Sequence, residues 1–408
     1  MSIEPTERAS APTVSLLERA ARRGCSGIAS SLPGLDVGRI ALAHDYLNQH
    51  GGAERVALEL TRIWPEAPLY TTIFRPGSTF PEFGDVDIRT SAIDRLPIDR
   101  HFRAALPLFP AAIRSLGPVD ADLVVASSSG WAHGLRVAPG GRLAVYCHNP
   151  ARWLYGEEYL GASSAQQRLA RPALGPLRRW DQRAAARADL YIANSQSTQD
   201  RIWRTYHRYA PIVHPPVEVD RFVASERGER LLVVSRLMPY KRIDLVVDAA
   251  TSAGIGLDVV GIGPAMDDLR RRSGPTVTFH GCVDDATVRE LIQTCRTLVL
   301  PGVEDFGITP VEAQAAGKPV VAFGEGGALE TVENGVTGVF FWRPEPQAVL
   351  AAIAAADALP TRPEQIAKLA QRFSRTAFTQ KLLATLSDGF GVRRPTEAAS
   401  ISARSLHC

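Results

Sequence analysis

The chain has 408 residues, of which 45% are hydrophobic and 22% charged, and its formal net charge is +3. This composition is that of an ordinary globular protein, so it excludes a collagen-like, coiled-coil or globally disordered chain. The longest apolar runs are much shorter than the roughly 18–20 residues that a membrane-spanning helix needs. At roughly 100–200 residues per domain, the length predicts two or three domains.

The positive charge comes almost entirely from arginine, with 42 Arg and four Lys, and it is not gathered into one long patch. We therefore expect no nucleic-acid binding. The five cysteines are an odd number, and none has C-x-x-C spacing. This pattern disfavours a disulfide scaffold or a zinc site and favours a reducing, cytoplasmic setting. The first residues show no basic region followed by an apolar core, so we expect no secretory signal.

The first part of the chain alternates between apolar strands and amphipathic helices. Residues 1–38 show no strand pattern and are expected to be a disordered extension. From residue 39 to 217 the alternation predicts a parallel sheet covered by helices on both faces. The predicted strands are Ile40–His44, Leu69–Phe74, Leu123–Ser127, Leu143–Cys147 and Leu190–Ala193. The predicted helices are Ala53–Ile63, Ser164–Ala188 and Thr198–His207.

A second alternation follows a break at His214–Asp220, where two prolines stop regular structure. We place a domain boundary there, with a second domain over 218–388 and a tail over 389–408. Its predicted strands are Leu231–Ser235, Leu257–Gly261, Thr276–His280, Thr297–Leu300 and Pro319–Phe323. Its predicted helices are Ile243–Ala253, Asp285–Cys295, Pro310–Ala316 and further helices from Pro344 to about Asp388. The predicted fold class is therefore α/β, with two facing, doubly wound Rossmann-like domains and C-terminal helices.

In such open sheets, ligands bind beyond the carboxyl ends of the strands, where loops and helix N-termini gather. Arg236 and Lys241 follow one predicted strand and precede a helix. A guanidinium and an ammonium there could converge on a diphosphate, although a solvated basic turn is the alternative.

The segment from Glu304 to Glu312 again joins a strand to a helix. Gly307 would let the backbone approach a ligand closely, and the amides opening the helix could face an anion. Each carboxylate can accept hydrogen bonds from the vicinal hydroxyls of a ribose or a hexose. Ordinary helix-start acidity accounts for Glu312 but poorly for Glu304.

Asp284 and Asp285 follow another predicted strand. One of them is well placed to cap the next helix. The other could accept both edge N–H groups of a guanine, whereas uracil offers only one such donor. A carboxylate here therefore favours a guanine nucleotide.

Two strand ends in the first domain carry weaker signals. Gly51-Gly52 opens a helix and is a candidate phosphate contact. His148 ends a strand and is followed by Asn-Pro, which marks a loop. A single histidine is more often structural than catalytic, but its place at a strand end favours a functional role.

Together these segments resemble the family 4 glycosyltransferases, a retaining family with the GT-B architecture of two facing Rossmann-like domains. The resemblance covers residues 39–388 and depends above all on the E-x7-E pair within EDFGITPVEAQAAGKPVVAFGEGG, residues 304–327. Further support comes from Gly51-Gly52, His148, Arg236 with Lys241, and Gly261-Ile-Gly263-Pro264. The HDYL and GGAERV segments look most similar to mannosyltransferases that build bacterial surface polysaccharides. The GCVDDAT segment is similar to the base-binding loop of GDP-mannose-using members.

The resemblance implies a role for each matching residue. Arg236 and Lys241 would stabilise the departing nucleotide diphosphate, which Gly52, beside Gly51, approaches from the opposite domain. His148 would contact the sugar near the reacting carbon, and Asp285 would read the base. Glu304 would hold the hydroxyls of the transferred sugar, and Glu312 would bind the ribose hydroxyls. The backbone amides beside Glu304 would come from Phe306, Gly307 and Ile308.

The implied chemistry is front-face attack, in which the leaving diphosphate helps to deprotonate the acceptor and no strong protein nucleophile is needed. Catalysis would then consist of positioning and of stabilising the departing charge. The sequence has no D-x-D motif at a strand end, and two cations can replace Mg²⁺, so we expect metal independence, no cofactor and a nucleotide-sugar substrate.

The sequence indicates less about the acceptor than about the donor. Asp99–Arg114 interleaves Phe102, Leu106, Leu108, Phe109 and Ile113 with arginines, and Arg152–Arg208 has ten Arg against five acidic residues. This combination suits an anionic membrane surface or a polyprenyl-diphosphate-linked saccharide. Buried packing is the alternative, because Pro107 and Pro110 interrupt any long helix.

We therefore expect a hexosyltransferase that moves mannose from GDP-mannose to a lipid-linked oligosaccharide. It would work at the inner face of the bacterial plasma membrane, as a peripheral membrane enzyme of lipopolysaccharide or exopolysaccharide biosynthesis. Three alternatives stay open: a UDP-sugar donor, a nucleotide-sugar 2-epimerase and a nucleotide-binding scaffold without turnover.

Overall fold

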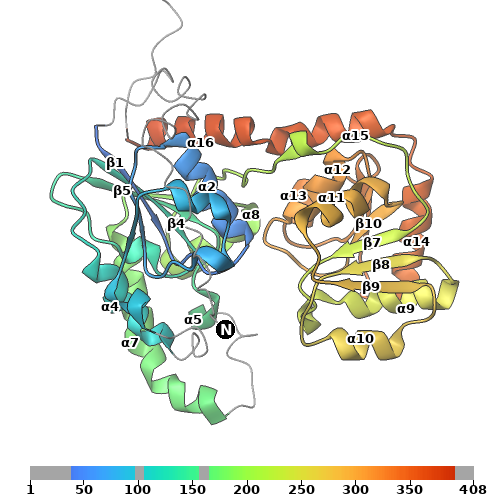
Figure 1. Cartoon of the computed structure of the whole chain (residues 1–408), viewed down its shortest axis with the longest axis horizontal. Coiled ribbons are helices and arrows are strands. Elements are labelled where there is room, and N and C mark those ends of the chain that lie inside the picture. The colour runs from blue at the N-terminus through green and yellow to red at the C-terminus, as the bar shows by residue number, and fades with distance from the viewer. Residues whose placement is uncertain (1–37, 97–104, 156–164, 391–408) are drawn as a thin grey trace, which may run out of the picture.

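A computed structural model describes residues 38–96, 105–155 and 165–390, and these form two α/β domains (Figure 1). The predicted extension and tail lie almost entirely outside these residues. Each domain contains one six-stranded parallel sheet, with the order β3-β2-β1-β4-β5-β6 in the first and β12-β11-β10-β7-β8-β9 in the second. Both are the doubly wound order of dinucleotide-binding folds, so the predicted fold class is confirmed.

The strands form where short apolar runs can be buried on both faces of a sheet. In the N-terminal domain they are β1 (Ile40–His44), β2 (Leu69–Thr71), β3 (Ile88–Thr90), β4 (Leu123–Ser128), β5 (Arg142–Cys147) and β6 (Leu190–Ala193). In the C-terminal domain they are β7 (Leu231–Val234), β8 (Leu257–Val260), β9 (Val277–Gly281), β10 (Thr297–Leu300), β11 (Val320–Phe323) and β12 (Gly338–Phe341). The edge strands β3 and β12 were not predicted.

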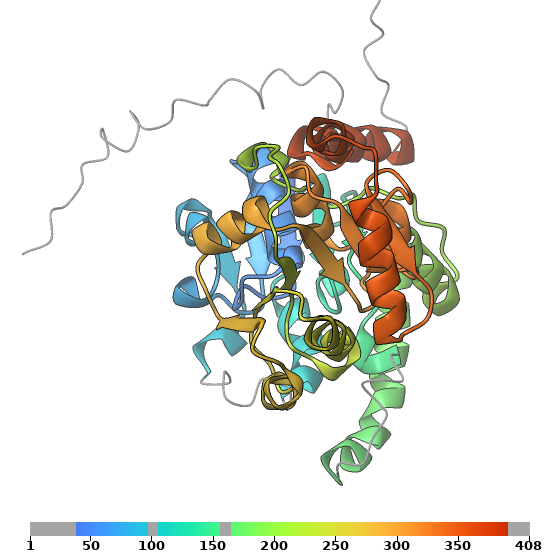
Figure 2. The same cartoon turned by 90° about the vertical axis from the view of Figure 1, so that its right-hand side faces the viewer.

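Helices cover both faces of the N-terminal sheet. They are α2 (Gly52–Ile63), α4 (Phe109–Ser115), α5 (Arg152–Tyr155), α7 (Ala165–Arg187) and α8 (Gln196–Tyr206). Residues of α4, α7 and α8 pack in the core on one face, and residues of α2 pack in the core on the other. One end of α7 extends away from the rest of the molecule in both views (Figures 1 and 2).

The C-terminal sheet is covered in the same way. Its helices are α9 (Ile243–Ala253), α10 (Met266–Arg272), α11 (Asp285–Thr294), α12 (Ile308–Ala315), α13 (Ala328–Thr331), α14 (Pro346–Asp357), α15 (Pro363–Ala370) and α16 (Arg375–Phe390). Residues of α9, α10 and α14 pack on one face, and residues of α11, α12 and α13 pack on the other. Short 3-10 turns are η1 (Pro76–Ser78), η2 (Pro81–Asp85), η3 (Ala92–Arg95), η5 (Leu106–Leu108), η6 (Ala132–Gly134), η7 (Val219–Arg221), η8 (Pro239–Lys241) and η9 (Gln371–Phe373).

The last helix, α16, returns to the first domain (Figure 1). Its Phe378, Leu382 and Leu386 are buried in the same core as α2 and β1. From its place in the chain we expected this segment in the C-terminal domain. Chain order does not tell which core an apolar helix face joins. The N-terminal domain therefore depends on residues from the far end of the chain.

The chain crosses between the domains twice, and the two crossings are paired. The backbone N–H of Val217 donates to the carbonyl of Phe373 at 2.9 Å. Around this pair lies a small apolar cluster, here called the hinge core, made of Val217, Val219, Phe306, Val311, Ala315, Ala370 and Phe373. The hinge is thus a packed structure and not a free linker.

The packing of α16 gives a stability prediction. Leu382 is fully buried, so Leu382→Ala is expected to cost about 2–5 kcal/mol and to lower the urea midpoint of the N-terminal domain. The exposed neighbour Lys381 provides the control, because Lys381→Ala removes no core volume. An unchanged midpoint for Leu382→Ala would show that α16 is not part of that core.

Candidate active site

The candidate site residues gather at the reversal point of each sheet, between β1 and β4 and between β7 and β10. Ligands of doubly wound sheets bind at such points, beyond the carboxyl ends of the strands. Gly51 and Gly52 follow β1, and Arg236 and Lys241 follow β7. Glu304 follows β10, whose loop lies so close to that of β7 that a Cβ on Gly302 would lie 2.7 Å from the Lys241 carbonyl oxygen.

The loops of the two domains meet directly. Gly52 is the first residue of α2, and a Cβ placed on it would lie 3.0 Å from Cδ1 of Ile308 in the other domain. A larger residue at position 52 would therefore press against α12. The structure thus brings together Gly52 and Ile308, two residues that the family resemblance placed on opposite sides of a nucleotide sugar.

The loop from Glu304 to Ile308 has a defined backbone. Gly307 precedes α12 with φ +89°, a conformation that favours glycine. The Gly327 N–H donates to the Glu304 carbonyl at 2.8 Å, and Phe306 is buried in the hinge core. The loop is thus held at both ends, with the first amides of α12 next to Glu304.

Lys241 is buried, and its ammonium forms an ion pair with the carboxylate of Glu304. Arg236 is exposed and, among the described residues, its guanidinium has no ion-pair partner. The two cations predicted to share one diphosphate therefore differ in their surroundings. Lys241 is neutralised by Glu304, the carboxylate predicted to bind the sugar, and Arg236 is available to bind an anion.

Glu312 pairs with Arg55, a residue to which the sequence assigned no role. Arg55 lies on α2, and its guanidinium nitrogens are 3.4 Å from Oε1 of Glu312 and 3.4 Å from Oδ1 of Asp285. Burial raises the pKa of Glu312, and Arg55 opposes that shift. Arg55 could have been identified from the sequence, because it lies one turn into the helix that Gly51-Gly52 opens.

The adjacent carboxylates Asp284 and Asp285 have separate functions. Asp284 caps α11 by accepting a hydrogen bond from the Thr287 N–H at 2.8 Å. Asp285 is 56% exposed and forms ion pairs with both Arg55 and Arg221. The capping interpretation therefore applies to Asp284, and the carboxylate assigned to the base is engaged by two guanidiniums.

His148 is buried at the end of β5 and lies within a polar chain. Its Nε2 is 2.8 Å from Oγ of Ser127, and that hydroxyl lies 3.1 Å from Nδ1 of His44. Burial, with a contribution from His44, lowers the pKa of His148 to about 3. The imidazole is therefore neutral at ordinary pH and acts as a hydrogen-bonding group rather than a cation.

Asp45 shapes the loop after β4, a role that the sequence did not indicate. Its buried carboxylate accepts hydrogen bonds from the N–H groups of Trp131 at 2.8 Å and Ala132 at 2.6 Å. It also accepts one from the Ser128 hydroxyl at 3.2 Å. This carboxylate therefore fixes the loop that neighbours His44 and Ser127.

Asp305 is another residue without a predicted role. Its carboxylate accepts a hydrogen bond from Asn149 at 3.1 Å and forms ion pairs with Arg152 and Arg201. All three donors belong to the N-terminal domain. Because Asn149 follows His148 and Asp305 follows Glu304, adjacency to predicted site residues was the available signal.

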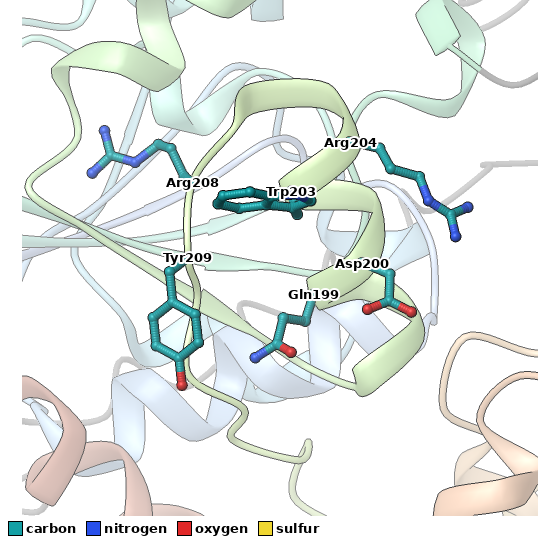
Figure 3. Close-up of a pocket in the computed structure, with 6 residues that line it drawn as sticks. All are labelled: Gln199, Asp200, Trp203, Arg204, Arg208 and Tyr209. Carbon is teal, nitrogen blue, oxygen red and sulfur yellow. The ribbon is translucent and has the colours of Figure 1, made fainter.

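Two pockets flank this region. One of about 270 Å³ lies at the domain junction and includes Arg55, Glu218, Arg221 and Asp285. A larger one of about 370 Å³ is lined by α8 and the residues after it, namely Gln199, Asp200, Trp203, Arg204, Arg208 and Tyr209 (Figure 3). None of these six is a predicted site residue, so the larger pocket is not the candidate active site.

The expected membrane-facing segment is divided. Residues 99–104, including Phe102, lie outside the described residues. Phe109 and Ile113 are fully buried, which supports core packing for them, whereas Leu108 is 54% exposed. No helix in the described ranges is long and apolar enough to cross a bilayer.

Two family models match consecutive parts of the chain. Residues 50–221 match the model described as Glycosyltransferase Family 4, and residues 218–376 match Glycosyl transferases group 1. Two solved structures share the fold. HepE of Anabaena, in complex with UDP, is 21% identical with a TM-score of 0.64, covering 86% of this chain and 100% of that chain. A sucrose-phosphate synthase of Thermosynechococcus elongatus is 17% identical with a TM-score of 0.64, covering 86% and 99%.

Curated relatives match over shorter stretches. A D-inositol 3-phosphate glycosyltransferase of Mycobacterium leprae is 30% identical, over 39% of this chain and 43% of that protein. A GDP-mannose-dependent alpha-(1-6)-phosphatidylinositol monomannoside mannosyltransferase of Mycobacterium tuberculosis is 39% identical, over 31% of this chain and 40% of that protein. The chain thus spans less than half of the length of these relatives. The two Rossmann-like sheets and the solved structures show that the chain has the GT-B fold, and its two domains are each similar to a glycosyltransferase family model.

Proposed function

We propose that the protein is a retaining hexosyltransferase that uses a nucleotide sugar as donor. The observation that carries this proposal is the placement of Glu304 and Glu312 around the Gly307 loop that opens α12, directly opposite Gly52. Carboxylates on both sides of a set of free amides suit a ligand with a diphosphate between two polyhydroxyl groups. A nucleoside diphosphate sugar has this pattern.

The proposed roles follow from the charges. Arg236 and Lys241 stabilise the diphosphate as it departs, and Glu304 holds the sugar hydroxyls. Neutral His148 hydrogen-bonds to the sugar, and Glu312 binds the ribose. Catalysis then consists of positioning and of stabilising departing negative charge, with the leaving diphosphate assisting deprotonation of the acceptor.

GDP-mannose is the donor that we favour. Asp285 supplies a carboxylate near the expected base position, and one relative is named as GDP-mannose-dependent. The ion pairs of Asp285 with Arg55 and Arg221 favour the second candidate, a UDP-sugar, because a carboxylate that stays paired cannot read a guanine edge. HepE, which shares the fold, was solved with UDP.

For the acceptor we propose a lipid-linked oligosaccharide, such as a polyprenyl-diphosphate-linked saccharide, used at the inner face of the bacterial plasma membrane in surface-polysaccharide biosynthesis. The support is the arginine-rich composition of residues 152–208 and the exposed Leu108, Trp203 and Tyr209. Metal independence is part of the same proposal, because Arg236 and Lys241 supply the positive charge that a divalent ion would otherwise bring.

The donor is tested by thermal-shift measurements with GDP, UDP, ADP and dTDP, run in EDTA so that metal dependence is tested at the same time. A nucleotide at about 100 times its dissociation constant adds about 2.7 kcal/mol to the free energy of unfolding, a clear rise in Tm. We expect GDP to give the largest shift. A shift with UDP alone would overturn the GDP assignment, and no shift with any nucleotide would support the scaffold alternative.

The role of Glu304 is tested by Glu304→Gln, which keeps the side-chain shape beside Lys241. Transfer is expected to fall by about 10²–10³-fold, as for other groups that act on the reacting centre. The affinity for the free nucleotide should not fall, since Glu304 contacts the sugar and its charge no longer holds Lys241. The paired variant Arg236→Ala is expected to weaken both nucleotide binding and transfer. Near-normal transfer in Glu304→Gln would contradict the assignment.

Glu312 gives a prediction for stability against pH. Because burial raises the pKa of its carboxyl in the folded protein, ionising Glu312 costs stability once the pH rises above the ordinary value of 4.5. Glu312→Gln is therefore expected to raise the Tm at pH 7, with the difference from wild type vanishing below pH 4.5. The same variant should bind nucleotide more weakly. A lower Tm at pH 7 would show that the ion pair with Arg55 outweighs the burial.

A further inference from the structure

We propose that Asp305 is a positioning residue that fixes Glu304 of the C-terminal domain relative to His148 of the N-terminal domain. The structural part of this inference stands on the contacts of Asp305 alone. Its consequence for sugar transfer rests on the proposed function, in which Glu304 and His148 contact the same sugar from opposite sides.

Both carboxylate oxygens of Asp305 are engaged by the opposite domain. Oδ2 accepts from Nδ2 of Asn149 at 3.1 Å and from the Arg152 guanidinium. Oδ1 accepts from the guanidinium of Arg201. The donors come from three segments, namely the β5–α5 connection, the start of α5 and α8. A single carboxylate therefore joins three donors across the domain junction.

On the N-terminal side, these donors are connected to His148. Asn149 is its neighbour in the chain. Arg201 also donates to Oγ of Ser197, at 2.9 Å, in the first turn of α8. In the same turn, the Thr198 hydroxyl donates to the carbonyl of His148 at 3.1 Å. A shift of Arg201 would thus be transmitted to the backbone that carries the imidazole.

On the C-terminal side, Asp305 lies between two fixed residues. Glu304 is paired with Lys241, and its carbonyl is held by the Gly327 N–H. Phe306 stacks on His214 with ring centroids 5.3 Å apart. Asp305 consequently cannot move without moving Glu304 or the hinge core.

Enclosure and charge set this contact apart from the ion pairs of Asp285 at the same junction. Burial acts to raise the pKa of Asp305, but Arg152 and Arg201 outweigh it and hold the pKa below the usual value. The Asp305 side chain is 20% exposed, whereas that of Asp285 is 56% exposed. Exposed pairs contribute little, while removing one partner of an enclosed pair leaves an uncompensated charge.

The test compares Asp305→Asn with Asp357→Asn. Asp357 pairs with Arg296 inside the C-terminal domain, so it is a matched control that loses a charge without affecting the junction. For Asp305→Asn we expect a larger radius of gyration by small-angle X-ray scattering, a nucleotide affinity within about twofold of wild type, and transfer lowered about tenfold or more, as misplacement of reacting groups produces. The control should match wild type in all three.

Scattering and transfer curves of Asp305→Asn that coincide with wild type would overturn the proposal. Weakened nucleotide binding with unchanged scattering would also overturn it, because Asp305 would then act within its own domain. If Asp305→Asn does not fold, Arg201→Gln removes the same contact from the other side, and the same outcomes apply. If wild type transfers no sugar, the scattering result still decides the structural proposal, so its failure is distinguishable from failure of the proposed function.

Discussion

The placement of every candidate site residue depends on the parallel direction of the strands. In a parallel sheet all the carboxyl ends lie along one edge, so the loops and helix starts that follow them accumulate there. Both sheets have the same strand order, and the reversal points bring the loop after β7 beside the loop after β10. Because the two edges face each other, free amides, arginines and carboxylates from separate domains occupy one region. That concentration of charge is what requires the cross-domain pairing of Asp305, Glu312 and Asp285.

The hinge core links the loop from Glu304 to Ile308 to the relative position of the domains. The two chain crossings pack together through Val217 and Phe373, and Phe306 inserts between them from the loop that carries Glu304. In many two-domain proteins the hinge is distant from the ligand, whereas here a hinge residue lies two positions from Glu304. Movement of one domain relative to the other would therefore move the loop that carries Glu304 directly, even before any contact with a ligand changes. The return of α16 to the first domain adds a second constraint on that movement.

Local signals predicted most of the strands and placed the candidate site residues at the strand ends. Strands such as Leu231–Val234 are runs of apolar residues, and the site residues follow such strands immediately, so short stretches of sequence were sufficient. The edge strands β3 and β12 were missed because their short apolar runs are interrupted by Arg89 and begin with Gly338, respectively. The partners of Asp305 could not be predicted, since Arg201 and Arg152 are 104 and 153 residues away in the chain. The role of Asp285 was inferred from its own position, which carries no information about the arginines that face it.

Both carboxylates proposed to bind hydroxyls are already paired with cations, and this affects what the site can bind. Lys241 is paired with Glu304 and Arg55 with Glu312, whereas Arg236 has no ion-pair partner among the described residues. A free phosphate would release Lys241 but leave the Glu304 carboxylate without a partner, and burying an unpaired carboxylate is costly. Under the proposed function a nucleotide sugar would avoid that cost, because its diphosphate would face the cations while its sugar and ribose hydroxyls would donate to the carboxylates. The site would then distinguish the full donor from its fragments by exchanging its internal ion pairs for contacts with the ligand. Because each ion pair joins a cation to a carboxylate, the ligand must bring an anionic group and hydroxyl groups together.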